Sequence, residues 1–315
     1  MSLSISIASR PIVALFAAAV LLARPADSPA QVRGKYPPGI NAMNSGTLPD
    51  EGLTYANYFQ WFSFDELKGP HGTDIPTAGR HLSVMIDHNF FKWTSKQKIL
   101  GAKLLLIGDL PLATSSLTSA ALGSISSGGG FADAYFQPFT LGWSSSRLDV
   151  TAGYAFMPPS GKFELGAVDN VGAGYWLNGP MSGQTVYLTK DKKTAASAFE
   201  LYGFHTKQED TDIRPGQTLS IDYSVTRSFS FQNMETLLQI GVVGYGQYQT
   251  TDRRGPGVDP AIAEITHYRV NALGPGAIVS FPDRKASMGV RYFWEFSNSS
   301  TVQGKSLQVY AAITF

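Results

Sequence analysis

Cysteine is absent from the 315 residues of this sequence. Disulfide bonds, thiolate metal sites and cysteine nucleophiles are therefore excluded. A net charge is nearly absent too, because 25 Lys and Arg stand against 24 Asp and Glu, a formal charge of +1. With no basic cluster either, we expect no nucleic acid partner. The charged fraction of 16% is low for a soluble domain, where about 25% is usual.

A hydrophobic run long enough to cross a membrane as a helix is also missing. The apolar run at residues 11–23 (PIVALFAAAVLLA) is shorter than the roughly 20 residues that such a helix needs. Arg10 precedes this run, and the small residues Ser28 and Ala30 follow it. This order is typical of a secretory signal, and we predict that residues 1–30 are a signal peptide cleaved after Ala30. Any membrane embedding of the remaining chain must then use strands.

From residue 52 onward, segments of about ten residues alternate apolar and polar side chains, as transmembrane strands do. In the last segment, Leu307, Val309 and Ile313 share one face, opposite Ser306 and Gln308. About twelve such segments follow one another, joined alternately by short and longer connections, as in outer-membrane barrels. We therefore predict an all-β fold, a transmembrane antiparallel up-and-down β-barrel of about 12 strands over residues 52–315.

The same physics predicts which side chains face the lumen. An Arg or Lys that faces lipid at the bilayer midplane costs about 2–4 kcal/mol, so charged strand residues should point inward. They could line a polar path or pair with one another and hold the barrel shut. The candidate lumen-lining residues are Arg147, Asp149, Asp222, Arg291, Phe293 and Glu295.

Two segments lack strand periodicity. Residues 31–51 are rich in Pro, Gly and Asn, and either fold into the lumen as a hatch or form a mobile periplasmic tail; we favour the hatch, because its apolar side chains need burial. Residues 109–130 are rich in Ser, Ala and Gly and are expected to be a loop, either folded inward or external. The candidate hatch residues are Tyr36, Pro37, Pro38, Gly39, Asn41 and Asn44.

Several short motifs resemble the phenol meta-pathway degradation protein family of Gram-negative outer membranes. The first is the stretch Tyr36 to Gly69, which opens with Tyr-Pro-Pro-Gly, although Ile40 stands where the family has Asn. The resemblance extends over essentially the whole chain after the signal peptide. Further motifs that carry it are Leu141-Gly142-Trp143, Asp149-Val150-Thr151-Ala152-Gly153-Tyr154, Asp169-Asn170-Val171-Gly172, Pro215-Gly216-Gln217 and Ala272-Leu273-Gly274-Pro275.

The resemblance implies an outer-membrane channel for uptake of small hydrophobic or aromatic compounds. The expected partners are the lipid bilayer, such a solute and, during biogenesis, the barrel-assembly machinery. The alternatives are a structural or surface barrel without transport and an outer-membrane lipid hydrolase. No Gly-x-Ser-x-Gly elbow, Ser–His strand pair or zinc-binding spacing is present, so we expect no enzyme activity, cofactor or metal.

Overall fold

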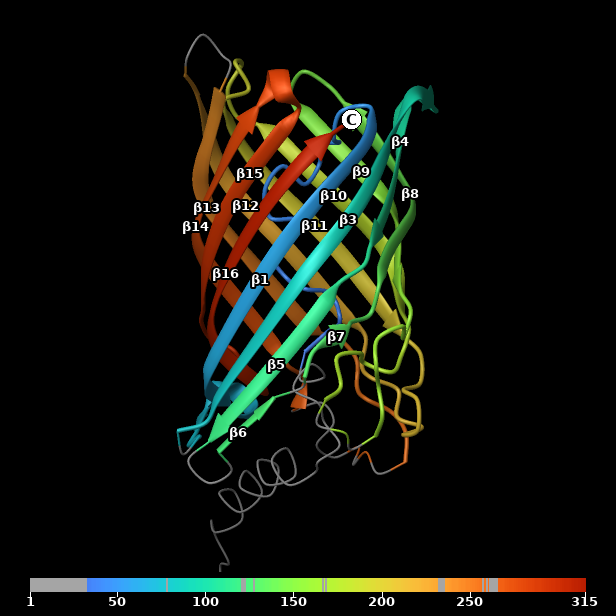
Figure 1. Cartoon of the computed structure of the whole chain (residues 1–315), viewed down its shortest axis with the longest axis vertical. Coiled ribbons are helices and arrows are strands. Elements are labelled where there is room, and N and C mark those ends of the chain that lie inside the picture. Colours follow the sequence, from blue (N-terminus) through green and yellow to red (C-terminus); the bar gives the residue numbers. More distant parts are fainter. Residues whose placement is uncertain are drawn as a thin grey trace, which may run out of the picture.

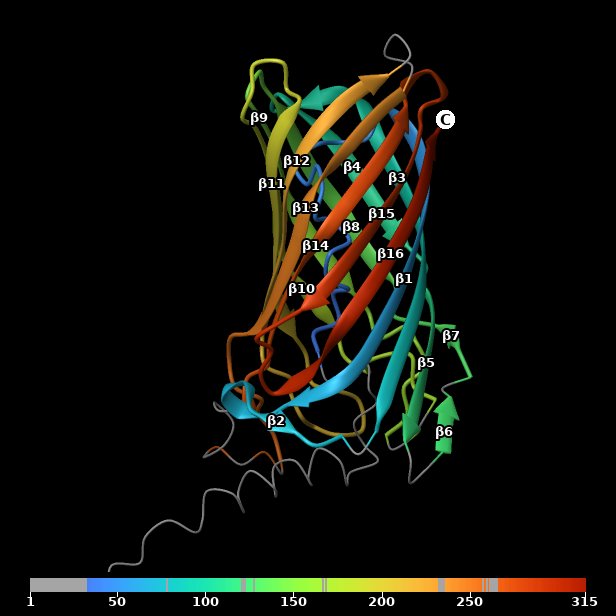
Figure 2. The same cartoon turned by 90° about the vertical axis from the view of Figure 1, so that its left-hand side faces the viewer.

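The computed structural model describes residues 33–315 except 78, 120–122, 127, 166, 168, 232–235, 257, 259 and 261–265. Within these residues sixteen strands form one antiparallel sheet, and twelve of the strands close into a barrel (Figures 1 and 2). The predicted signal peptide lies outside the described residues. No helix in the described part of the chain is long and apolar enough to cross a membrane.

The barrel closes through its first strand, which pairs with the last strand on one side and with β3 on the other. Every barrel strand thus has two neighbours over most of its length, and the prediction of a closed antiparallel barrel is confirmed. In chain order the barrel strands are β1 (Gly52–Lys68), β3 (His81–Ile99), β4 (Ala102–Asp109), β8 (Tyr135–Ser144), β9 (Leu148–Met157), β10 (Leu177–Tyr187), β11 (Thr194–His205), β12 (Thr218–Phe231), β13 (Thr236–Gln249), β14 (Arg269–Phe281), β15 (Ala286–Glu295) and β16 (Thr301–Thr314).

The connections separate the two ends of the barrel. Short turns, such as the one between β14 and β15, lie at the end where the C-terminus is marked, and long connections, such as residues 158–176, lie at the other end (Figure 1). Short turns face the periplasm in barrels of this class, so the long connections mark the extracellular end.

Alternation along each strand sorts side chains between lipid and lumen. On β13, Val242 is 51% exposed on the outer face, whereas its neighbour Val243 is 0% exposed inside. Polar side chains line the interior, among them Gln60 and Gln247. The outer face is largely apolar, as lipid requires, and large side chains that it exposes include Met85, Phe139, Val225, Met288 and Val309.

Two carboxylates on the outer face accept hydrogen bonds from side chains of a neighbouring strand. Asp87 of β3 accepts a hydrogen bond of 2.6 Å from Asn57 of β1. Glu200 of β11 accepts hydrogen bonds from Ser182 and Gln184 of β10, at 2.8 and 3.1 Å. Paired acceptors of this kind lower the cost of placing a carboxylate near lipid.

The expectation of a loop over residues 109–130 is wrong. This region contains β5 (Leu112–Ser119), β6 (Gly123–Ser126) and β7 (Gly130–Phe131). β5 continues the line of β4 and pairs with the extracellular half of β3, in register from His81 to Asp87. Pro111 separates β4 from β5, because proline has no backbone N–H to donate to the ladder. A fourth additional strand, β2 (Asp74–Ile75), pairs with the extracellular end of β1.

The lipid-facing register predicts a position-dependent penalty for an introduced charge. Val242→Arg, in the middle of β13, should lower the free energy of unfolding in lipid vesicles by about 2–4 kcal/mol. Thr250→Arg, just beyond the end of β13, is the control and should cost about 0–1 kcal/mol. Equal unfolding midpoints in denaturant for the two variants would show that Val242 does not face hydrocarbon.

Candidate functional site

The lumen is occupied by residues 33–51, called the hatch segment below. The segment runs inside the barrel from the extracellular end toward the periplasmic end, where β1 begins at Gly52 (Figures 1 and 2). Its apolar side chains Tyr36, Ile40 and Met43 are buried in the main hydrophobic cluster together with inward-facing strand residues. The interior is therefore packed with protein along this line.

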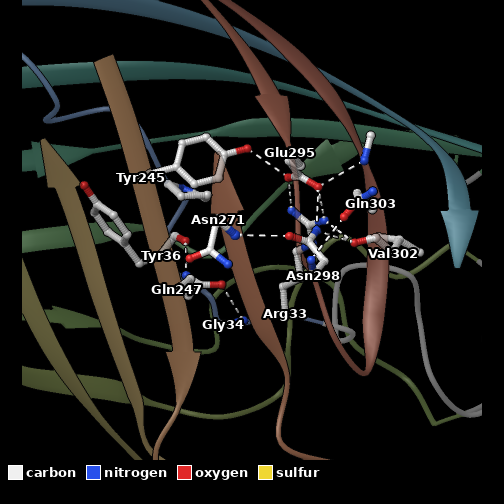
Figure 3. Close-up of polar contacts among 12 residues, drawn as sticks. Arg33, Gly34, Tyr36, Tyr245, Gln247, Asn271, Glu295, Asn298, Val302 and Gln303 are labelled. Carbon is white, nitrogen blue, oxygen red and sulfur yellow. Dashed lines mark hydrogen bonds and ion pairs between the residues drawn. The ribbon is translucent and has the colours of Figure 1, made fainter. Parts of the chain in front are cut away.

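An ion pair fixes the extracellular end of the hatch segment. Arg33 donates two hydrogen bonds to the Glu295 carboxylate, at 2.5 and 2.7 Å (Figure 3). The same carboxylate accepts from Tyr245 at 2.8 Å and from Asn298 at 3.0 Å. Burial lowers the pKa of Arg33, but the charge of Glu295 outweighs it, and the net effect raises the pKa. The guanidinium therefore stays charged.

A second cation holds the neighbouring stretch to the extracellular connections. The Lys35 ammonium lies 2.8 Å from an Asp133 oxygen and donates to the Tyr175 carbonyl at 2.6 Å. Burial lowers the pKa of Lys35, and the charge of Asp133 opposes this shift. Because both partners are almost fully buried, removal of either would leave an unpaired charge inside the protein.

Asp222 of β12 is the central anchor of the hatch segment. Its carboxylate is 0% exposed and accepts three hydrogen bonds from the segment. The donors are the Tyr36 hydroxyl at 2.6 Å, the Gly39 amide at 2.8 Å and the Asn41 amide at 3.0 Å. One strand carboxylate thus replaces the water that these groups would otherwise bind, and it fixes the turn around Gly39.

The turn brings the backbone of the hatch segment close to the barrel wall. Gly39 has a φ of +87°, and a Cβ at this position would lie 2.9 Å from Gln308 Nε2 and 3.0 Å from the Phe293 ring. Gln308 donates to the Pro38 carbonyl at 2.9 Å, and Arg291 donates to the Ile40 carbonyl at 3.4 Å. Position 39 therefore requires glycine for both its conformation and its space.

The periplasmic part of the segment is held by three other strands. The Asn44 and Gln239 amides bond reciprocally at 2.8 and 2.9 Å. The Gly46 amide donates to the Thr185 hydroxyl at 3.1 Å, and the Thr47 hydroxyl donates to Asp149 at 3.3 Å. Together with Asp222 and Glu295, these contacts tie the hatch segment to the barrel at both ends and in the middle.

The candidate lumen residues divide into two groups. Asp149, Asp222, Arg291, Phe293 and Glu295 are buried inside the barrel, and the four ionisable ones contact the hatch segment. The placement of Arg147 in the lumen is wrong. β9 begins only at Leu148, so Arg147 lies in the exposed turn after β8 and donates to the Tyr187 carbonyl.

The wall of the barrel splits in its extracellular half. The periplasmic half of β3 pairs with β4, which continues to β8 through Asp109 and Tyr135. The extracellular half of β3 pairs with β5, whose other neighbours are β6 and β7, not β8. We call the place where β5 and β8 part the wall split. Large apolar side chains are exposed around it, including Leu110, Leu112 and Phe131.

A cavity of about 150 Å³ lies behind the wall split and is called the split cavity. Inward-facing residues of β1, β3 and β5 line one side, the hatch segment lines another, and residues 132–133 and 170–173 complete it. Most of its strand side chains are apolar. Those on β1, β3, β5 and β9 include Phe62, Phe64, Val84, Ile86, Ala113 and Met157.

Two more cavities follow along the hatch segment. A middle cavity of about 20 Å³ shares Tyr36, His88 and Met157 with the split cavity. A periplasmic cavity of about 410 Å³ shares Ile40 and Tyr58 with the middle one. The middle cavity has room for about one water molecule, so it closes the axial path to anything larger.

One buried pair next to these cavities was not predicted from the sequence. His88 Nδ1 lies 2.6 Å from Asp109 Oδ2, and His88 Nε2 lies 3.1 Å from Gln60 Oε1. The period-two pattern of β3 places His88 inward with Phe90, but Asp109 belonged to the loop expected over residues 109–130, whereas it is the last residue of β4. No cluster of three or more His, Asp or Glu side chains that could hold a metal occurs in the described ranges.

Comparisons with known proteins give one family and a set of barrels. The model of the family described as "Putative MetA-pathway of phenol degradation" matches residues 64–310. An outer-membrane channel from Pseudomonas putida F1 is similar over 89% of this chain and 100% of its own, with a TM-score of 0.69 and 14% identity. The β domain of the Bordetella autotransporter BrkA covers 84% of this chain and 100% of its own, at a TM-score of 0.47 and 11% identity. No curated protein sequence matches.

Loss of the central anchor should free the hatch segment. Asp222→Ala removes the acceptor of three hydrogen bonds, so single-channel conductance in planar bilayers should rise above that of the wild type. Because the chain has no cysteine, Ala42→Cys, at a fully buried position of the segment, reports its release directly. Thiol labelling of this cysteine should be slow in the otherwise wild-type barrel and at least tenfold faster with Asp222→Ala. Unchanged labelling and conductance would show that Asp222 does not hold the segment in place.

Proposed function

The chain belongs to the MetA-pathway phenol degradation family, and we propose that it is an outer-membrane channel for uptake of small hydrophobic or aromatic compounds. The observation that carries this proposal is the largely apolar split cavity directly behind an interruption of the barrel wall. The likeness of fold to a bacterial outer-membrane channel supports the same location in the cell.

The hatch segment argues against a general aqueous pore. It runs through the lumen, and the cavity beside its middle part has a volume of only about 20 Å³. A barrel of about eight strands is filled by its own side chains, whereas sixteen or more leave an open channel. This twelve-stranded barrel would leave space, and the hatch segment takes that space. The hatch segment therefore acts as a gate that keeps water-soluble compounds out.

The wall split offers apolar solutes a different route. A solute in the split cavity is separated from lipid only by the β5 side of the wall and by the segments around residues 132 and 171. Since lipid is as apolar as the solute, exit sideways through the wall avoids the polar lumen and the constriction below. We infer that the solute leaves the barrel by this route and reaches the membrane interior.

Export and assembly follow from the same proposal. Residues 1–30 act as a cleaved signal peptide, so the intact mass of the mature protein should correspond to a chain that begins at Gln31. The closed sheet that ends in β16 and Phe315 is a substrate for the barrel-assembly machinery.

We propose no catalytic activity for this barrel. His88 and His205 are buried, and their ring nitrogens meet Asp109, Gln60 and the Gly216 carbonyl rather than a serine hydroxyl. A lipid hydrolase needs a serine nucleophile next to its histidine base. The buried polar groups of this barrel instead hold the wall and the hatch segment together.

Filling of the split cavity should block uptake. Ala113 of β5 lines the cavity, opposite Ile86 of β3, and Ala113→Trp would place an indole in this space. Cells whose only copy carries this change should take up labelled toluene at least fivefold more slowly than wild type, at limiting concentration. Ala152→Trp, on the outer face of β9, is the size-matched control and should leave uptake unchanged. If Ala113→Trp cells, with normal barrel levels in the membrane, took up toluene at the wild-type rate, the split cavity would not be the route.

A further inference from the structure

The split cavity has the size of a binding site for one aromatic ring. Its volume of about 150 Å³ equals that of an engineered apolar cavity known to bind benzene. Aromatic and aliphatic side chains from several strands surround it, including Phe62 and Phe64 of β1 and Ile86 of β3. A monocyclic aromatic compound would fill this volume and bury its ring against apolar groups.

The inner end of this cavity is polar. His88, which is 3% exposed, borders both the split cavity and the middle cavity, and Asp109, which is 1% exposed, borders the middle cavity. The pair is joined through Asp109 Oδ2, at 2.6 Å from the imidazole. The other carboxylate oxygen, Asp109 Oδ1, is buried and has no hydrogen-bond partner among the described residues. A buried acceptor without a donor is unfavourable, so a hydrogen-bond donor from outside the chain would stabilise this oxygen.

The two cavities together have the volume that a hydroxylated ring needs. The larger one accommodates the ring, and the middle one, at about 20 Å³, has room for about one oxygen-sized group. They meet at Tyr36, His88 and Met157. A ring held in the split cavity can therefore direct one polar substituent past His88 to the free oxygen of Asp109.

We propose that this is a recognition site for a monocyclic aromatic compound with one hydroxyl group. The ring lies in the split cavity, and the hydroxyl donates its hydrogen bond to Asp109 Oδ1, while His88 fixes the carboxylate through Oδ2. The site deepens the proposed uptake function and rests on it. A hydrogen bond to a buried carboxylate should favour phenol over toluene, which has the same size, by roughly tenfold to a hundredfold in affinity.

The test compares the affinities of purified protein for phenol, toluene and anisole, measured by competition with one labelled aromatic probe. Anisole keeps the oxygen of phenol but has no hydrogen to donate, so it should bind no better than toluene. In Asp109→Asn the phenol preference over toluene should fall at least fivefold, with toluene affinity unchanged. Partition of each ligand into detergent is the same for every variant. The phenol-to-toluene affinity ratio of a variant, divided by the same ratio in the wild type, is therefore independent of this partition.

Asp87→Asn is the matched control. It makes the same substitution on β3, one residue from His88 and on the opposite face, and should keep the wild-type preference. The ligand series in the wild-type protein tests the site even if Asp109→Asn does not fold. Equal affinity for phenol, toluene and anisole, with normal uptake of all three, would overturn the hydroxyl site and leave the proposed channel standing. If none of the three binds or is taken up, both proposals fail.

Discussion

Hydrocarbon offers no partner to a backbone N–H or carbonyl group, and this constraint governs the whole molecule. The chain meets it by closing a sheet on itself, with β1 paired to both β3 and β16. Closure fixes the register, and the register assigns every second side chain to lipid or to the lumen. The polar interior, the hatch segment and the position of the wall split all follow from that assignment.

The polar groups of the interior also need hydrogen-bond partners, and the hatch segment supplies them. Inward-facing carboxylates and amides, such as Asp222 and Gln308, are cut off from bulk water and need partners. Residues 33–51 lack regular secondary structure, so their own amides and carbonyls also need partners. Each set satisfies the other, as at Asp222, which accepts from the Gly39 and Asn41 amides. The segment is thus part of the folded interior, and its removal would take away the three hydrogen bonds that Asp222 accepts from it.

Much of this architecture could be predicted because it depends on local patterns. Period-two alternation predicted about twelve strands over residues 52–315, and twelve strands close the barrel, from β1 at Gly52 to β16. The inward placement of Asp222 and Glu295 follows from the cost of a charge in lipid. The prediction was wrong for Arg147 because this residue lies one position before β9, in a turn where water solvates it.

Features that depend on contacts between distant segments could not be predicted. β5 is short and rich in Ser and Thr, and Pro111 breaks the pattern between it and β4, so its sequence reads as a loop. Only its pairing with β3 reveals that it extends the wall. The partner of His88 could not be predicted for the same reason. Asp109 lies at the end of β4, next to the break at Pro111. The wall split, and the cavity behind it, therefore emerge only from the tertiary structure.

The central claim is that apolar solutes leave through the wall split. Uptake measured with a reversible disulfide bond at this place tests the claim most directly. Gly130 of β7 lies beside β5, and Val171, which lines the split cavity, lies in the connection between β9 and β10; a Cβ built at Gly130 would be 3.7 Å from Val171 Cγ2. Cysteines at both positions are within reach of a disulfide, and the chain has no other thiol. Oxidation should abolish uptake of an aromatic solute, and reduction should restore it. Equal uptake in the oxidised and reduced states would contradict passage through the wall.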